Sequence, residues 1–379
     1  MRTHSMIART LLSSAVMLAL FVPDASADII GPGNTRTVGP GSPIVSWVLQ
    51  QDSTLNVLAG GATSYIQAQA GSTVNLQGAT VTGDDTTVRD AIALVDSRAN
   101  IVDSTISSAT RSAISLGYAA GTPDPGSRAD IRGGTITGAG EGAISLSGNS
   151  TLTLAGTTVR GVGTGPYGGN AVWSFGGVVE VAEGSTLIGD QSGIFVGMSD
   201  AGTLVPDAGT VLVDASSVEG IASSAIVVQT LPSSARQDVS ILVRNGSVLK
   251  GGDGNLLLVR NAFTAGDASV ANFQVESSVL NGNVVAEDMA EAHVTLLNGG
   301  RINGRFDNVT TATIGDGGHW QLTGDSDVGQ LALGPGGVVA LGDGTAFNTL
   351  TITGDYTGSG GTLLFNTVLG DDTAASDKL

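Results

Sequence analysis

Two histidines, His293 and His319, are the only ones beyond the first residues of the chain, and they limit the acid–base chemistry that it can support. A serine hydrolase needs a histidine to take the proton of its nucleophile and pass it on. Ser192 stands in a Gly-Asp-Gln-Ser-Gly phrase at 189–193 that is similar to a nucleophile loop. Both histidines occur late in the chain in strand-like or turn contexts, and the serine phrase reads as an ordinary turn. We therefore expect no catalytic residue.

Charged side chains gather at one place in the sequence, at Asp84, Asp85, Arg89 and Asp90. Clustered carboxylates with a basic residue, often with Ca²⁺, are what a polysaccharide-cleaving enzyme needs. A solvated loop explains the same residues, and we favour it. The Gly-Gly-Asp-Gly-Asn phrase at 251–255 matches one unit of a calcium-binding repeat, but adjacent copies supply the ligands of such a site. We therefore expect neither a metal nor a cofactor.

Two tryptophans could form a ligand platform or part of a core. Trp47 lies near the start of the expected mature chain, where a solenoid must cap its open end. Trp173 lies in an alternating Val-Trp-Ser-Phe segment, so Val172 and Trp173 should point to opposite faces. We favour a core or cap role for both.

The elements that would position these residues follow from an internal repeat. A phrase of two small or polar residues, an apolar residue and often X-Gly recurs along the chain. Its apolar members should be buried and stacked in one file; they are Val81, Ile106, Ile136, Val159, Leu187, Val218, Val248, Val279 and Ile302. Segments such as Thr151 to Leu154 alternate with period two, as strands do, and helical periodicity is absent. Three short strands per repeat predict an all-β fold, a right-handed parallel β-helix or solenoid.

The N-terminal residues and the composition indicate export. Arg2 and Arg9 precede an apolar run from Leu11 to Val22 and a small-residue site, which is typical of a signal peptide cleaved between Ala27 and Asp28. The chain has no cysteine, so packing and hydrogen bonds alone must hold it together. Its net charge of −18 makes nucleic acid and anionic membranes poor partners.

The last segment resembles the passenger end of pertactin-like autotransporters. It contains Trp-Gln-Leu-Thr, Phe-Asn-Thr-Leu-Thr-Ile, Tyr-Thr-Gly-Ser-Gly-Gly-Thr-Leu, Leu-Gly-Asp-Asp and Ser-Asp in the order of that family. The resemblance implies that residues 316–379 are an autochaperone segment, a β-helix end that folds first outside the cell. Its core would comprise Trp320, Leu322, Phe347, Leu350, Tyr356 and Leu363. It also implies an outer-membrane β-barrel translocator, which this chain does not contain.

These features together predict a signal peptide at 1–27, an N-terminal cap at 28–60, a parallel β-helix passenger at 61–315 and the autochaperone segment at 316–379. We expect a monomer exported through the periplasm to the cell surface or the medium. The resemblance implies an autotransporter passenger of type V secretion, most simply an adhesin or virulence factor that presents loops on a stiff rod. Its ligand would be a protein or glycan of a host or neighbouring cell. The alternative is a β-helical polysaccharide lyase or hydrolase.

Overall fold

The computed structural model describes residues 27–83, 89–119, 126–165, 168–198, 209–230, 237–264, 267–370 and 374–379. The expected leader at 1–27 lies outside these residues except for Ala27, and Asp28 begins the first strand. Every regular element in the described part of the chain is a β-strand. No helix found there is long and apolar enough to cross a membrane.

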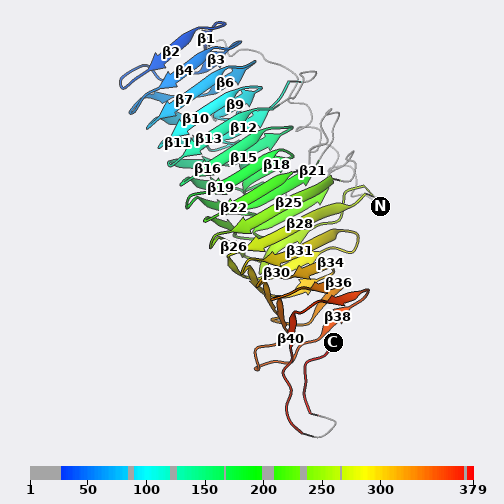
Figure 1. Cartoon of the computed structure of the whole chain (residues 1–379). Helices are drawn as coiled ribbons and strands as arrows, with labels where there is room; N and C mark the ends of the chain where they lie inside the picture. The colour runs from blue at the N-terminus through cyan, green and yellow to red at the C-terminus, as the bar shows by residue number, and fades with distance from the viewer. Residues whose placement is uncertain are drawn as a thin grey trace.

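The strands form parallel sheets, and successive turns of the chain add one strand to each in sequence order along the rod (Figure 1). The first sheet contains β1 (Asp28–Ile30), β3 (Trp47–Leu49), β6 (Ile66–Gln69), β9 (Ile92–Val95), β12 (Ile114–Gly117), β15 (Gly142–Ser147), β18 (Asn170–Phe175), β21 (Ile194–Met198), β24 (Ile226–Thr230), β27 (Asn255–Val259), β30 (Asn283–Ala286) and β33 (Phe306–Asp307).

The second sheet runs the length of the rod. It contains β2 (Thr35–Val38), β4 (Thr54–Val57), β7 (Thr73–Gln77), β10 (Arg98–Val102), β13 (Arg128–Arg132), β16 (Thr151–Ala155), β19 (Val178–Ala182), β22 (Thr210–Asp214), β25 (Gln237–Arg244), β28 (Ser269–Glu276), β31 (Glu291–Leu297), β34 (Val309–Ile314), β36 (Ser326–Leu333), β38 (Leu350–Ile352) and β39 (Tyr356–Gly358).

The third position in the turn is divided between two sheets. The third sheet contains β5 (Ala62–Thr63), β8 (Thr80–Thr82), β11 (Thr105–Ser108), β14 (Thr135–Gly138), β17 (Thr158–Gly161), β20 (Thr186–Gly189), β23 (Ser217–Gly220) and β26 (Val248–Gly251). The fourth sheet contains β29 (Val279–Asn281), β32 (Arg301–Asn303), β35 (His319–Gln321), β37 (Val338–Ala340) and β40 (Thr362–Leu364). A parallel β-helix is thus confirmed, and its right-handed sense stays a prediction.

The core lies inside this coil, where alternate side chains of most strands join apolar files. In the third sheet Val81, Ile106 and Ile136 are in register with one another, and the file continues to Val218. These side chains are at most 1% exposed. Full burial of one aliphatic side chain contributes about 1.5–3 kcal/mol, so a file that runs through the rod supplies much of the stability.

Two members of the predicted file are wrong. Val248 and Val279 are 53% and 57% exposed, and the file passes instead through Leu249 and Leu280, which are at most 3% exposed. Val218 pairs with Leu249, and Leu280 pairs with Ile302 across the fourth sheet. The sequence phrases had been aligned on valine, a residue that suits both faces of a strand.

Buried serines at the corner before the third or fourth sheet fix the true register. Ser216, Ser247 and Ser278 each lie two residues before a buried apolar residue. The Ser247 hydroxyl accepts the backbone N–H of Ser216 at 3.2 Å and donates to the carbonyl of Arg244 at 2.6 Å. Because an unpaired backbone group is expensive to bury, these hydroxyls stabilise the corner.

The two ends of the rod are where the cap and the autochaperone segment are predicted. In the part predicted as the N-terminal cap, residues 28–60, β1 pairs with β3 and β2 pairs with β4 in the main sheets, and the bounds of the cap stay a prediction. Within the predicted autochaperone core, Trp320, Leu322 and Leu350 are buried, and Leu363 packs partly buried against them.

Phe347 and Tyr356 do not belong to that core. Their side chains are 39% and 46% exposed. Tyr356 is on β39, an edge strand of the second sheet, and no further described strand covers it. The predicted packing therefore fails at the outermost turn, where side chains lack a neighbour on one side.

Candidate functional site

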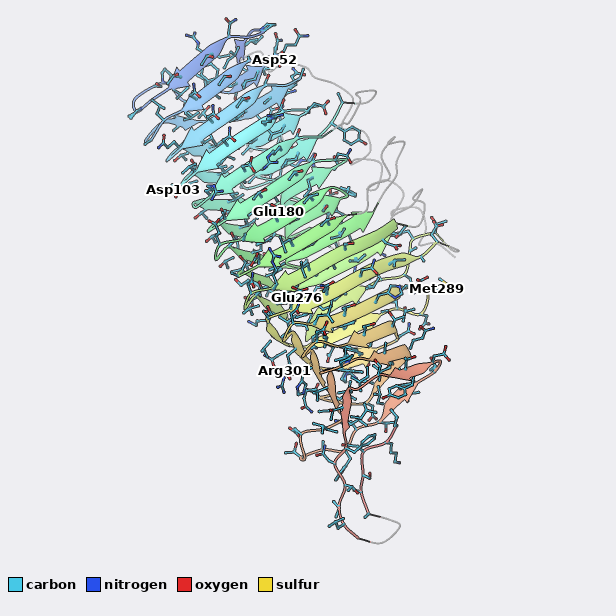
Figure 2. The ribbon with its side chains drawn as sticks, viewed as in Figure 1. Asp52, Asp103, Glu180, Glu276, Met289 and Arg301 are labelled. Carbon is cyan, nitrogen blue, oxygen red and sulfur yellow. The ribbon has the colours of Figure 1, made fainter. Side chains whose placement is uncertain are left out.

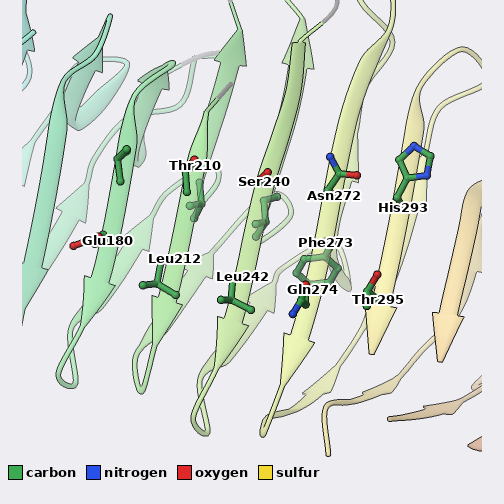
Figure 3. Close-up of a pocket in the computed structure, with 13 residues that line it drawn as sticks. Glu180, Thr210, Leu212, Ser240, Leu242, Asn272, Phe273, Gln274, His293 and Thr295 are labelled. Atoms are coloured by element: carbon green, nitrogen blue, oxygen red, sulfur yellow. The ribbon is translucent and has the colours of Figure 1, made fainter. Parts of the chain in front are cut away.

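The outer face of the second sheet carries a shallow trough across β19, β22, β25, β28 and β31. Its volume is about 330 Å³. Strand alternation points two columns of side chains outward. One column holds Thr210, Ser240, Asn272 and His293, and the other holds Glu180, Leu212, Leu242, Gln274 and Thr295 (Figure 3). Of these residues, sequence reasoning identified only His293.

Two leucines form the apolar part of the trough. Leu212 and Leu242 occupy the same register position on neighbouring strands, and both are half-buried. Leu242 in turn is opposite Gln274 on the next strand. A pair of partly exposed leucines beside hydroxyl and amide groups presents an apolar surface with polar groups along it, as ligand sites do.

Several polar groups in the trough are not used by the protein itself. In the part of the chain that the structure describes, the side chains of Thr210, Ser240 and Asn272 make no hydrogen bond. The neighbouring groups are held in place: Gln274 donates to Glu276 at 2.6 Å, and His293 Nδ1 lies 2.9 Å from the Thr311 hydroxyl. The arrangement therefore combines oriented side chains with free donors and acceptors.

A second cluster lies at the corner where the chain enters the first sheet. Burial raises the pKa of the Asp90 carboxyl, although the Ser115 hydroxyl, the charge of Arg111 and the Ser112 N–H act in the opposite direction. Burial also raises the pKa of Glu141; Arg111 opposes this rise and the charge of Asp90 adds to it. The positive charge of Arg111 thus acts on both the Asp90 and the Glu141 carboxyl.

This cluster only partly matches the charged group predicted from the sequence. Asp84 and Asp85 lie outside the described residues, and the Arg89 guanidinium lies 5.2 Å from the ring centre of Tyr65. Asp90 is half-buried rather than a solvated loop residue. Glu141 was missed because it lies on a distant turn of the sequence that the stacking of strands brings close to Asp90.

The tryptophans are both buried, as predicted. Trp47 is inward in the first sheet, paired in register with Ile66, and joins the main core. Val172 also points inward, whereas Trp173 points outward and stacks on Phe195 with ring centres 4.2 Å apart. Trp173 is only 2% exposed, so it is part of a second apolar cluster rather than an open platform.

The serine and glycine-rich phrases have structural roles. Asp190 pairs with Arg160 and accepts the N–H of Gly163 at 3.0 Å, while Ser192 is buried. Asp253 accepts the Ser224 hydroxyl at 2.7 Å in its turn. Among the described residues no group of three or more His, Asp or Glu side chains could hold a metal ion.

The two histidines lie apart from these phrases. His293 is in the trough on β31, and His319 is on β35 of the fourth sheet. Burial lowers the pKa of His319, and the nearby charge of Arg301 lowers it further. Figure 2 shows Arg301, Glu180 and Glu276 on the outer surface of the rod.

Comparison with known proteins identifies the C-terminal part of the chain. Residues 326–379 match the model of the Autochaperone Domain Type 1 family. A segment of 162 residues is 30% identical to the uncharacterized protein YuaQ of Escherichia coli strain K12, covering 42% of this chain and 10% of that protein. The match therefore spans about a tenth of the length of that relative. The parallel β-helix and the C-terminal match to the autochaperone domain together fit an autotransporter passenger.

Proposed function

We propose that the passenger is an adhesin or host-interaction factor and that it binds its ligand through the trough on the second sheet. An autotransporter passenger is exported through the periplasm to the cell surface or the medium by an outer-membrane translocator. The observation that carries the proposal is the pair of half-buried leucines beside polar groups that make no other hydrogen bond. Repeated stacking of turns makes a stiff rod that holds such a surface away from the membrane.

Adhesion of bacteria that display the chain tests this proposal. Cells that express it ahead of an outer-membrane translocator should bind to cultured epithelial cells or to one another. A Leu212→Ser/Leu242→Ser variant should lose most of this binding, because both changes remove the apolar part of the trough. Ile221→Ser is the matched control, since Ile221 is 48% exposed and lies outside the trough.

Two results would contradict this role for the trough. One is equal adhesion by wild type and the double-leucine variant at equal surface amounts. The other is equal loss of adhesion in the Ile221→Ser control.

A polysaccharide-cleaving enzyme is the second candidate, and the paired carboxyls of Asp90 and Glu141 favour it. Raised pKa values and a shared arginine, Arg111, are features of acid–base sites as well as of structural ion clusters. Release of reducing ends or of unsaturated sugars from pectin and related polysaccharides would support it. Such activity must fall by about 100-fold in Glu141→Gln, the loss that follows removal of a general acid or base.

A further inference from the structure

We propose that the trough on the second sheet binds a neutral oligosaccharide that lies along the axis of the rod. This inference rests on the proposed surface-binding function and names the class of its ligand. Four properties of the trough carry it: its apolar pair, its free polar groups, its charge and its period.

The apolar pair suits the flat C–H face of a pyranose ring. Leu212 and Leu242 are neighbours in register, so their side chains form one small apolar surface across two strands. A leucine pair is not large enough to anchor a protein helix or a lipid chain by itself. It matches the size of one or two sugar rings, which bury little apolar area each.

The polar groups suit the hydroxyls at the edge of the same rings. Asn272 offers two N–H donors and one carbonyl acceptor, and Ser240 on the adjacent strand offers a hydroxyl in the same column. Gln274 has its amide nitrogen engaged by Glu276, so its carbonyl oxygen is oriented as an acceptor. A sugar hydroxyl both donates and accepts, and it can satisfy such a mixed set of groups.

The charge of the trough excludes an acidic glycan as the preferred ligand. No Arg or Lys lines it within the described chain, and Glu180 is at its edge. The protein as a whole carries a net charge of −18. A polyanion would meet repulsion at long range and would find no basic partner on arrival.

The period of the surface suits a polymer. The columns repeat once per strand, at about 4.8 Å, so the five strands of the trough span about 19 Å along the axis. Equivalent outward positions therefore recur at a spacing comparable to the advance of one sugar unit in an extended glycan. A chain of several units can contact successive strands with similar groups.

Binding of defined hexasaccharides to the purified full chain tests the proposal. The probes are neutral hexamers of glucose and of N-acetylglucosamine, with an acidic hexamer of galacturonate for comparison, measured by isothermal titration calorimetry. We expect at least one neutral hexamer to bind and the acidic hexamer to bind more weakly. Asn272→Ala should weaken the neutral binding about fivefold or more, the effect of one hydrogen bond of about 1 kcal/mol.

Gln330→Ala is the matched control. Gln330 occupies the same outward column as Asn272 but lies two strands beyond the trough, on β36. Its removal should leave the affinity unchanged. Circular dichroism of both variants verifies that the fold is retained.

Three results would overturn the glycan inference: no binding of either neutral hexamer at millimolar concentration, tighter binding of the acidic hexamer, or equal losses in Asn272→Ala and Gln330→Ala. If displayed cells still adhere through the leucine pair while the purified chain binds no neutral sugar, the glycan inference fails and the adhesive function stands. If sugar binds in the trough but the double-leucine variant still adheres, the glycan inference stands and the adhesive function of the trough fails.

Discussion

Trp320 is the largest fully buried side chain, and its removal should weaken the C-terminal end of the rod. It is 0% exposed and stacks on Phe306 with ring centres 4.0 Å apart and planes at 12°. Its indole N–H donates to the carbonyl of Gly304 at 3.0 Å. Trp320→Ala therefore removes a stacked ring and a hydrogen bond and leaves a cavity.

The expected loss follows from these contacts. Truncation of a buried aromatic side chain to alanine costs about 3–5 kcal/mol in the free energy of unfolding. The Gly304 carbonyl loses its donor as well, and an unsatisfied buried polar group costs about 1–3 kcal/mol. Trp320→Phe keeps a ring in contact with Phe306, so it should lose mainly this second part.

Urea unfolding of the full chain, followed by circular dichroism and by limited proteolysis, measures the effect. Phe347→Ala is the matched control, because Phe347 belongs to the same segment but is 39% exposed. It should cost only about 0.5–1 kcal/mol. A loss below about 1 kcal/mol for Trp320→Ala, or an equal loss for Phe347→Ala, would refute the packing argument.

Three further predictions follow from the register, the C-terminal contacts and the acid pair. Leu249→Ala should lower the free energy of unfolding by about 2–5 kcal/mol, and Val248→Ala should change it by no more than about 0.5 kcal/mol, in thermal or urea unfolding. A larger loss for Val248→Ala would contradict this register and support the one in which Val248 is buried. Asp377→Asn should cost about 1.5–3 kcal/mol in urea, since this buried carboxylate accepts N–H groups at 2.6–2.9 Å; an unchanged midpoint would contradict it. The raised pKa values of Asp90 and Glu141 mean that folding favours their protonated forms. Stability should therefore fall as pH rises from their ordinary values of 3.8 and 4.5 through the raised values. Thermal melts across this pH range should show a smaller fall in melting temperature for the Asp90→Asn/Glu141→Gln variant than for the wild type. An equal dependence of melting temperature on pH in the two proteins would contradict this.

The fold could be predicted from the sequence because the solenoid repeats one local pattern. Each turn must bury its own apolar residues against its neighbours, so residues such as Ile106 and Ile136 recur at the same place in the phrase. The predicted register is wrong at Val248 because valine occurs on both faces of a strand, so its position does not show which face is buried. The serine two residues before the buried position would have placed Leu249 correctly.

The candidate site could be predicted only in part. Leu212 stands in a Thr-Val-Leu-Val strand, where strict alternation places it outside beside the buried Val211 and Val213. A continuous apolar run hides that alternation. The approach of Glu141 to Asp90 depends on which turns stack, and the sequence spacing of the turns varies too much to show it. Burial of Trp47 was expected at an open solenoid end, but this residue lies one turn further in, between β1 and β6.

The start of the predicted C-terminal unit stays a prediction. Its expected start at residue 316 lies in the turn between β34 and β35, whereas the fourth sheet begins at β29 and the family match begins at residue 326. The break between the third and fourth sheets lies between Gly251 and Val279. Local motifs showed the autochaperone phrases, but strand pairing extends this sheet further toward the N-terminus.

Surface exposure on intact cells tests the central claim, that this chain is an autotransporter passenger. The full chain is expressed ahead of an outer-membrane translocator, and external protease is added before the cells are broken. We expect the chain to be digested from outside in cells with the translocator and protected in cells without it. Protection in both, with the translocator correctly inserted, would contradict the assignment.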